Sequence, residues 1–122
     1  MALFGLVAVV AAACGASEGG AAPGDARRGR QLFVTQACAG CHVVESLRGA
    51  DGSIGPELSN IGSEAETRVA GQDAQTYLRT AIVFPNAFVV KGYEANVMPL
   101  DYGESLSLQQ RRDLVAYLLS LR

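Results

Sequence analysis

The 122-residue chain has no marked excess of charge of either sign and no tryptophan. Ten Lys and Arg residues are balanced by twelve Asp and Glu residues, which leaves a formal net charge of −2 at pH 7. Nucleic-acid-binding domains concentrate positive charge, so this composition excludes a polybasic nucleic-acid binder. The length corresponds to one domain and excludes a large multidomain enzyme. Hydrophobic residues make up 49% of the chain, which is typical of a folded globular domain.

Charge is also missing from the amino-terminal end, where the first charged side chain is Glu18. Residues 1–13 (MALFGLVAVVAAA) are apolar but too few to cross a bilayer, which takes about 20 residues. Their length is typical of the apolar core of a secretory signal peptide. We therefore predict that the protein is exported and works in the periplasm or on the extracytoplasmic face of a bacterial membrane.

Small residues stand directly before Cys14, and this pattern resembles a bacterial lipoprotein signal, in which such a Cys becomes the acylated amino terminus. The alternative is cleavage at an ordinary Ala-x-Ala site, which would leave Cys14 as a plain thiol. An exposed thiol is a liability in an oxidising compartment, so we expect Cys14 to be the lipid attachment residue. Residues 14–24, rich in Gly, Ala and Ser, are predicted to be a flexible tether, and residues 25–122 the folded domain.

Three segments of the folded part have helical spacing and recognisable ends. Asp25 is a good N-cap, and Pro85 stops a helix that precedes it. Ser107 and Gln110 form the pattern of a capping box, after which one apolar stripe follows. The members of that stripe are Leu108, Leu114, Val115, Leu118 and Leu121. The predicted helices cover residues 26–37, 73–83 and 107–121.

The segments between these helices are long and rich in turn-forming residues. Residues 43–72 contain repeated glycines and are predicted to hold one short helical turn at most, and residues 85–106 are predicted to be irregular. Loops of this length are unusual in a small domain unless they have a function. A large cofactor at the centre would supply the core that so little regular structure cannot build.

The strongest motif is Cys38-Ala39-Gly40-Cys41-His42. The C-x-x-C-H pattern is typical of covalent c-type haem attachment, because both thiols can reach the vinyl groups along one haem edge and the following imidazole can ligate the iron. A thioredoxin-like redox pair would need a βαβ context, which the sequence lacks. Half of a zinc site, or a structural disulfide between Cys38 and Cys41, is also compatible with the two cysteines.

The second axial ligand follows from how few candidates exist. His42 is the only histidine, and Met98 is the only methionine outside residues 1–13. Met98 lies in a polar, proline-containing segment, 56 residues after His42. A methionine is often simple core filler, but in this position we expect its sulfur to ligate the iron. Two filled axial positions favour an electron carrier over an enzyme that binds oxygen or peroxide.

With these motifs in place, residues 25–122 resemble a class I cytochrome c of the small bacterial monohaem kind. In that family a glycine and an aromatic residue of the first helix pack against an aromatic residue of the last helix, and Gly29, Phe33 and Tyr117 match them. The resemblance implies an all-α class I cytochrome c fold, with three to four short helices and long loops wrapped around one covalent haem c.

The family also has a Gly-Pro pair followed by Leu after the haem motif, and Gly55-Pro56-Glu57-Leu58 matches it. The resemblance implies that the Pro56 carbonyl accepts a hydrogen bond from His42. The haem-binding residues expected on this basis are Cys38, Cys41, His42, Pro56 and Met98, with His42 and Met98 as metal ligands.

The stretch from Tyr77 to Pro99 is similar to the cytochrome c domains of haem-copper oxidase subunit II and to monohaem lipoprotein subunits of respiratory complexes such as alternative complex III. This implies an electron carrier that passes single electrons between a redox donor and an acceptor protein, as a shuttle or as a subunit of a membrane respiratory or photosynthetic complex. It would be held at the membrane by the lipid anchor, with no nucleic-acid partner and no catalytic residues of its own. The alternative is a haem-dependent peroxidase or catalytic subunit with a displaceable Met98.

Overall fold

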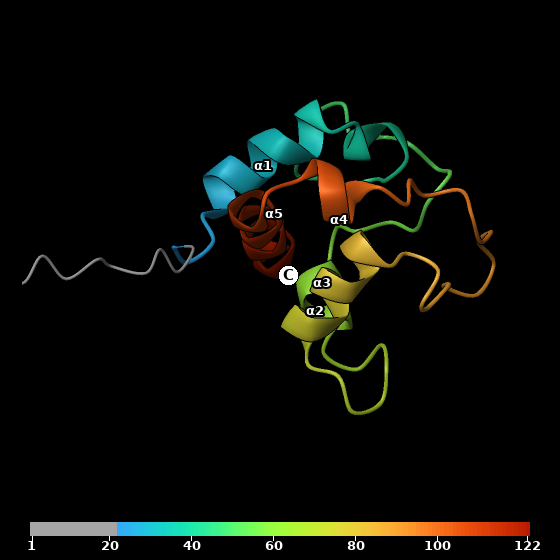
Figure 1. Cartoon of the computed structure of the whole chain (residues 1–122). Coiled ribbons are helices and arrows are strands. Elements are labelled where there is room, and N and C mark those ends of the chain that lie inside the picture. Colours follow the sequence, from blue (N-terminus) through green and yellow to red (C-terminus); the bar gives the residue numbers. More distant parts are fainter. Residues whose placement is uncertain (1–21) are drawn as a thin grey trace, which may run out of the picture.

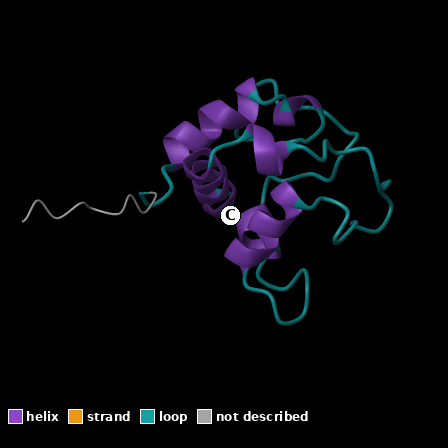
Figure 2. Ribbon diagram, in the orientation of Figure 1, coloured by secondary structure: helices purple, strands orange, loops and turns teal. Residues whose placement is uncertain are grey.

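The structure is a computed structural model that describes residues 22–122. This part of the chain is helical and contains no strand, only an isolated antiparallel bridge between Val43 and Asp51 (Figure 2). The predicted all-α class is therefore confirmed. Its elements, in chain order, are α1 (Ala26–Thr35), the 3-10 helix η1 (Cys38–Gly40), α2 (Ile61–Glu64), α3 (Ala74–Val83), α4 (Tyr102–Ser105) and α5 (Leu108–Ser120).

The first and last helices, α1 and α5, lie against each other (Figure 1). Gly29 allows this approach, because a Cβ at this position would overlap the carbonyl group of Asp113 on α5. Next to it, the rings of Phe33 and Tyr117 meet edge to face with their centroids 5.6 Å apart. The packing expected of these three residues is confirmed.

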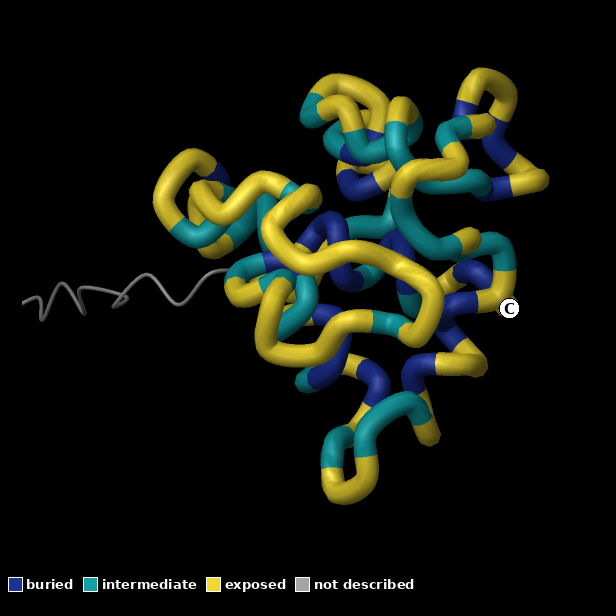
Figure 3. Tube along the Cα trace, turned by 90° about the vertical axis from the view of Figure 1, so that its right-hand side faces the viewer, coloured by how far each residue is buried: buried dark blue, intermediate teal, exposed yellow. Residues whose placement is uncertain are grey.

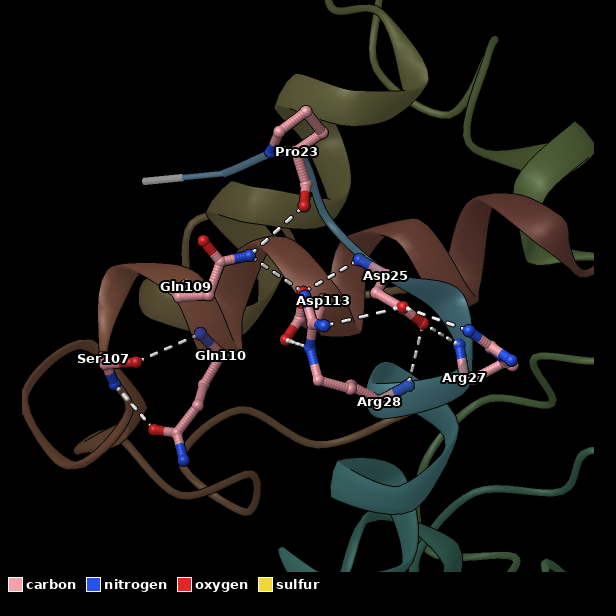
Figure 4. Close-up of polar contacts among 8 residues, drawn as sticks. All are labelled: Pro23, Asp25, Arg27, Arg28, Ser107, Gln109, Gln110 and Asp113. Atoms are coloured by element: carbon pink, nitrogen blue, oxygen red, sulfur yellow. Dashed lines mark hydrogen bonds and ion pairs between the residues drawn. The ribbon is translucent and has the colours of Figure 1, made fainter. Parts of the chain in front are cut away.

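A buried carboxylate joins the same two helices. The side chain of Asp113 is 3% exposed and accepts hydrogen bonds from the Arg28 guanidinium, with Nε at 2.8 Å, and from the backbone N–H of Asp25 at 2.8 Å (Figure 4). Gln109 Nε2 donates to it at 3.0 Å. A buried charge needs such partners, and here they tie the start of α1 to the middle of α5.

Both helices begin as the sequence predicts. The Asp25 side chain accepts from the backbone N–H groups of Arg27 and Arg28, and Ser107 and Gln110 form the complete capping box. The apolar stripe of α5 is buried except at Leu108, which is 49% exposed. Leu108 is the first residue of α5, and the buried residues of that helix begin only at Asp113.

Helix α3 begins at the N-cap Asp73, whose side chain accepts from the Thr76 backbone N–H at 2.7 Å, and it ends two residues before Pro85. The single turn expected within residues 43–72 is α2. The expectation that residues 85–106 are wholly irregular is wrong, since α4 forms a further turn there. A hydrogen bond of 2.8 Å from the Tyr102 hydroxyl to the Gln36 carbonyl ties that turn to the end of α1.

Long loops complete the domain, and one of them runs from residue 84 to residue 101 between α3 and α4. Seen from its side, this loop is an almost continuous exposed stretch (Figure 3). Pro23 and Gly24, at the end of the segment assigned to the tether, lie against α5, where Gln109 Nε2 donates to the Pro23 carbonyl at 3.3 Å. Within residues 22–122, no helix has the length and apolar character needed to span a membrane. The segment 1–13, predicted to be a signal peptide, and Cys14, the predicted lipid attachment residue, lie outside the described residues.

Candidate functional site

The two cysteines and the histidine of the CAGCH motif lie in a tight turn directly after α1. Ala37 has a positive φ of 63°, which reverses the chain after the helix. In the turn that follows, the backbone N–H groups of Cys41 and His42 both donate to the carbonyl of Cys38, at 3.1 and 3.0 Å. The side chains of Cys38, Cys41 and His42 all line one cavity as a result.

This cavity has a volume of about 240 Å³ and an apolar lining. Met98 lines it as well, as does Pro56. All five residues predicted to bind haem therefore line one cavity, although Met98 is far from the others in sequence. Helix α3 provides one wall, and the segments after the motif and before α4 provide others. Apolar lining residues from these elements include Ile54, Leu58, Leu78, Ala81, Ile82, Phe88 and Val97.

The orientation of His42 is fixed by its neighbours. Its Nδ1 lies 2.6 Å from the carbonyl oxygen of Pro56, and because a carbonyl can only accept, Nδ1 carries the proton and donates. The neutral ring then has its free lone pair on Nε2, which is the state of a metal-ligating histidine. Gly55 lies against the same ring, and a Cβ there would overlap it.

The ionisation of His42 agrees with this tautomer. Burial lowers the pKa of its imidazole, because a positive charge is poorly solvated in the apolar cavity, while the hydrogen bond to Pro56 acts in the opposite direction. The lowered pKa favours the neutral ring, which can act as a ligand.

The thiols of Cys38 and Cys41 are free, so the structure does not contain the disulfide that the sequence left open. Burial is the main cause that raises the pKa of Cys38 to about 11, which keeps this thiol protonated. Within residues 22–122, no group of three His, Cys, Asp or Glu side chains could hold a metal ion. Cys38 and Cys41 therefore lack, in this region, the further ligands that a zinc site requires.

Several apolar side chains of the lining are open to solvent. Ile54 is 59% exposed, Phe88 41% and Val97 50%, all beside the cavity. A large flat apolar group in the cavity would remove such side chains from water, which stabilises a bound state by about 25 cal/mol per Å² of apolar surface. The two thiols, one imidazole, one thioether and the apolar lining therefore fit a haem.

Some residues of the site were given no individual role from the sequence. Arg68, in the loop after α2, contributes a cation to the lining; it pairs with Glu64 at 2.8 Å and lies 5.8 Å from the ring centroid of Tyr77. Asn86 lines the cavity and bonds to Asn96, two residues before Met98. No periodicity or spacing marks these residues, since their roles come from contacts between distant segments.

The comparison with known families agrees with this site. A family model described as Cytochrome c matches residues 26–122. No curated protein matches the chain significantly. The matched region contains the CAGCH motif, Pro56 and Met98, and it includes every residue that lines the cavity.

Proposed function

Since the chain belongs to the cytochrome c family through residues 26–122, we propose that it is an electron carrier with one covalently bound haem c per chain. The observation that carries the proposal is the convergence of Cys38, Cys41, His42 and Met98 on one apolar cavity. The family as a whole supports electron transport and haem binding.

Cys38 and Cys41 would attach the group. Each thiol would add across one vinyl double bond, so that its sulfur bonds to one carbon and its hydrogen goes to the other. No oxidant or reductant is consumed in this addition. Their placement on a turn tied by two hydrogen bonds to the Cys38 carbonyl holds both sulfurs beside His42.

His42 and Met98 would hold the iron, with Nε2 of His42 free to bind because Nδ1 donates to Pro56. Pro56 is thus a positioning residue, and its carbonyl raises the basicity of the ligating ring. When bound, haem supplies one-electron exchange between ferric and ferrous iron. Imidazole and thioether ligands together favour a higher reduction potential than two imidazoles.

The rest of the cavity would tune the site. Its apolar side chains exclude water, which disfavours the additional positive charge of the oxidised state. Arg68 would pair with a carboxylate of the porphyrin, a role supported by its position in the cavity lining and its 19% exposure. Its contact with Glu64 holds the guanidinium in that position.

The same proposal includes a redox protein as electron donor and another as acceptor, in a membrane respiratory complex. It also includes an exported, lipid-anchored location. Both parts are supported by the apolar segment 1–13, by Cys14, and by the similarity of the stretch from Tyr77 to Pro99 to complex-associated cytochrome domains. Purification from native membranes in mild detergent, followed by identification of what accompanies the protein, tests the partner directly.

The absorption spectrum tests the haem. In matured protein we expect a c-type α-band that persists after acid-acetone extraction, together with a low-spin ferric spectrum. A high-spin ferric spectrum, or avid binding of carbon monoxide by the native reduced protein, would instead support the peroxidase alternative. Absence of any haem band would overturn the proposal.

A further inference from the structure

The loop that contains Met98 is closed at its base by two asparagines. The backbone N–H of Asn96 donates to Oδ1 of Asn86 at 2.9 Å, and Nδ2 of Asn86 donates to Oδ1 of Asn96 at 2.8 Å. Ten positions separate the two residues in sequence. We call this pair the asparagine clasp.

The geometry of the clasp requires an amide at position 86. A backbone N–H can only donate, so the Asn86 oxygen must face Asn96, and its NH₂ group is then directed at the Asn96 side-chain oxygen. An aspartate would keep the first bond but place two acceptors against each other at the second. A leucine of similar size would lose both bonds.

Asn96 adds a second feature of the clasp. Its φ of 62° lies in the left-handed region, which asparagine tolerates better than most residues and glycine tolerates best. The turn at Asn96 directs the chain into Val97 and Met98, and Met98 lines the cavity that Asn86 also lines. The clasp therefore connects the base of the loop to the position of the Met98 side chain.

Little else fixes this part of the chain. The loop is largely exposed, with Val97 at 50% and Leu100 at 60%. Two backbone bonds within it, Ala87 to Phe84 and Tyr93 to Val90, close local turns only. Phe88 packs edge to face on Tyr77, with centroids 6.0 Å apart, and anchors the first half of the loop. The second half, which contains Met98, lies between the clasp at Asn96 and the hydrogen bond from Tyr102 to Gln36.

We propose that Asn86 is a positioning residue that holds the Met98 sulfur at the iron through the asparagine clasp. The inference rests on the proposed function, since it takes Met98 as an axial ligand. The clasp then sets the ratio of a closed form, with Met98 bound, to an open form with a free axial position. The strength of two hydrogen bonds thus decides how readily another small ligand reaches the iron.

Imidazole is a suitable probe because it binds the ferric protein only in the open form. While the closed form dominates, the apparent imidazole affinity is proportional to the open-to-closed ratio. A hydrogen bond of average strength changes an equilibrium about fivefold. We expect Asn86→Leu to raise the imidazole affinity about 25-fold and to weaken the near-infrared sulfur-to-iron absorption.

Two further variants separate the two bonds. Asn96→Gly suits the positive φ and keeps the backbone donor, so it removes the side-chain bond alone and should raise the affinity about fivefold. Asn86→Asp should raise the imidazole affinity about fivefold or more, because its carboxylate faces the Asn96 oxygen. Asn60→Ala is the matched control, since Asn60 is exposed and makes no side-chain capping bond, and it should match the parent.

The outcomes are distinguishable. If haem is attached and Met98→Ala abolishes the near-infrared absorption, but all three clasp variants bind imidazole within twofold of the parent, the positioning role is wrong and the proposed function stands. If the parent lacks c-type haem or the near-infrared absorption, the proposed function itself fails. If Asn86→Leu does not mature, Asn96→Gly decides the question by the same fivefold criterion.

Discussion

Replacing Asp113 with Asn should remove a defined, pH-dependent part of the stability of the domain. Its carboxylate is almost fully buried between α1 and α5. The side-chain hydrogen bond from Arg28 is the largest cause that lowers the pKa of Asp113 from 3.8 to about 2, against the opposing effect of burial, and the Asp25 backbone N–H and Gln109 lower it further. The folded state thus prefers the charged carboxylate more strongly than the unfolded chain does.

The size and sign of the effect follow from that shift. A lowering of nearly two pKa units corresponds to about 2 kcal/mol of folding free energy. Because the pKa is lowered in the folded state, this stabilisation is fully present above pH 3.8 and is lost as the pH falls through about 2. Asp113→Asn should therefore be about 2 kcal/mol less stable than the parent at neutral pH. On acidification it should lose less stability than the parent does.

Urea unfolding of the haem-loaded protein, followed by far-ultraviolet circular dichroism between pH 2 and pH 7, measures this directly. Urea is preferable to guanidinium because it does not screen charge. Glu104→Gln is the control, since Glu104 is an exposed carboxylate on α4. If the stability curves of Asp113→Asn and the parent run parallel over this pH range, the carboxylate does not contribute as the structure indicates.

Four other substitutions give simple tests. Met98→Ala should lower the midpoint potential and abolish the near-infrared sulfur-to-iron absorption, and an unchanged spectrum would refute Met98 as ligand. Gly29→Ala should destabilise the domain by about 1–3 kcal/mol in thermal or urea unfolding, because its Cβ would overlap the Asp113 backbone. Gly40→Ala is the control and should destabilise the domain less, because an added Cβ there meets nothing within 4 Å. Arg68→Gln should lower the midpoint potential by removing a positive charge beside the cavity, and an equal or higher potential would contradict its role there. Cys14→Ser should move the protein from the membrane to the soluble periplasmic fraction with its spectrum unchanged, and a variant that stays with membranes must be anchored differently.

The parts of the fold that follow from local chemistry could be predicted from sequence. Asp25 and the pair Ser107 and Gln110 mark helix starts because capping depends on residues three positions apart at most. The CAGCH motif is equally local, and the scarcity of histidine and methionine left Met98 as the candidate for the second ligand. The structure then places that residue in the same cavity.

The parts that depend on distant contacts could not be predicted. Helix α4 has only four residues, too few for periodicity, and its Tyr102 bonds to Gln36 across 66 positions. The clasp between Asn86 and Asn96 joins two exposed polar residues that resemble ordinary loop residues in sequence. Leu108 belongs to the apolar stripe of α5 but is exposed. Helical spacing shows which face of a helix is apolar, but it does not show at which residue along the helix that face begins to pack against the rest of the domain.

The pairing of α1 with α5 has a consequence for the order of assembly. A ribosome releases the CAGCH segment long before it releases α5, whose residues end at Ser120. Until then α1 has no partner for Gly29 and Phe33, and the wall that contains Met98 does not yet exist. The packing of α1 therefore waits for α5, and every segment that lines the cavity lies between these two helices in the sequence.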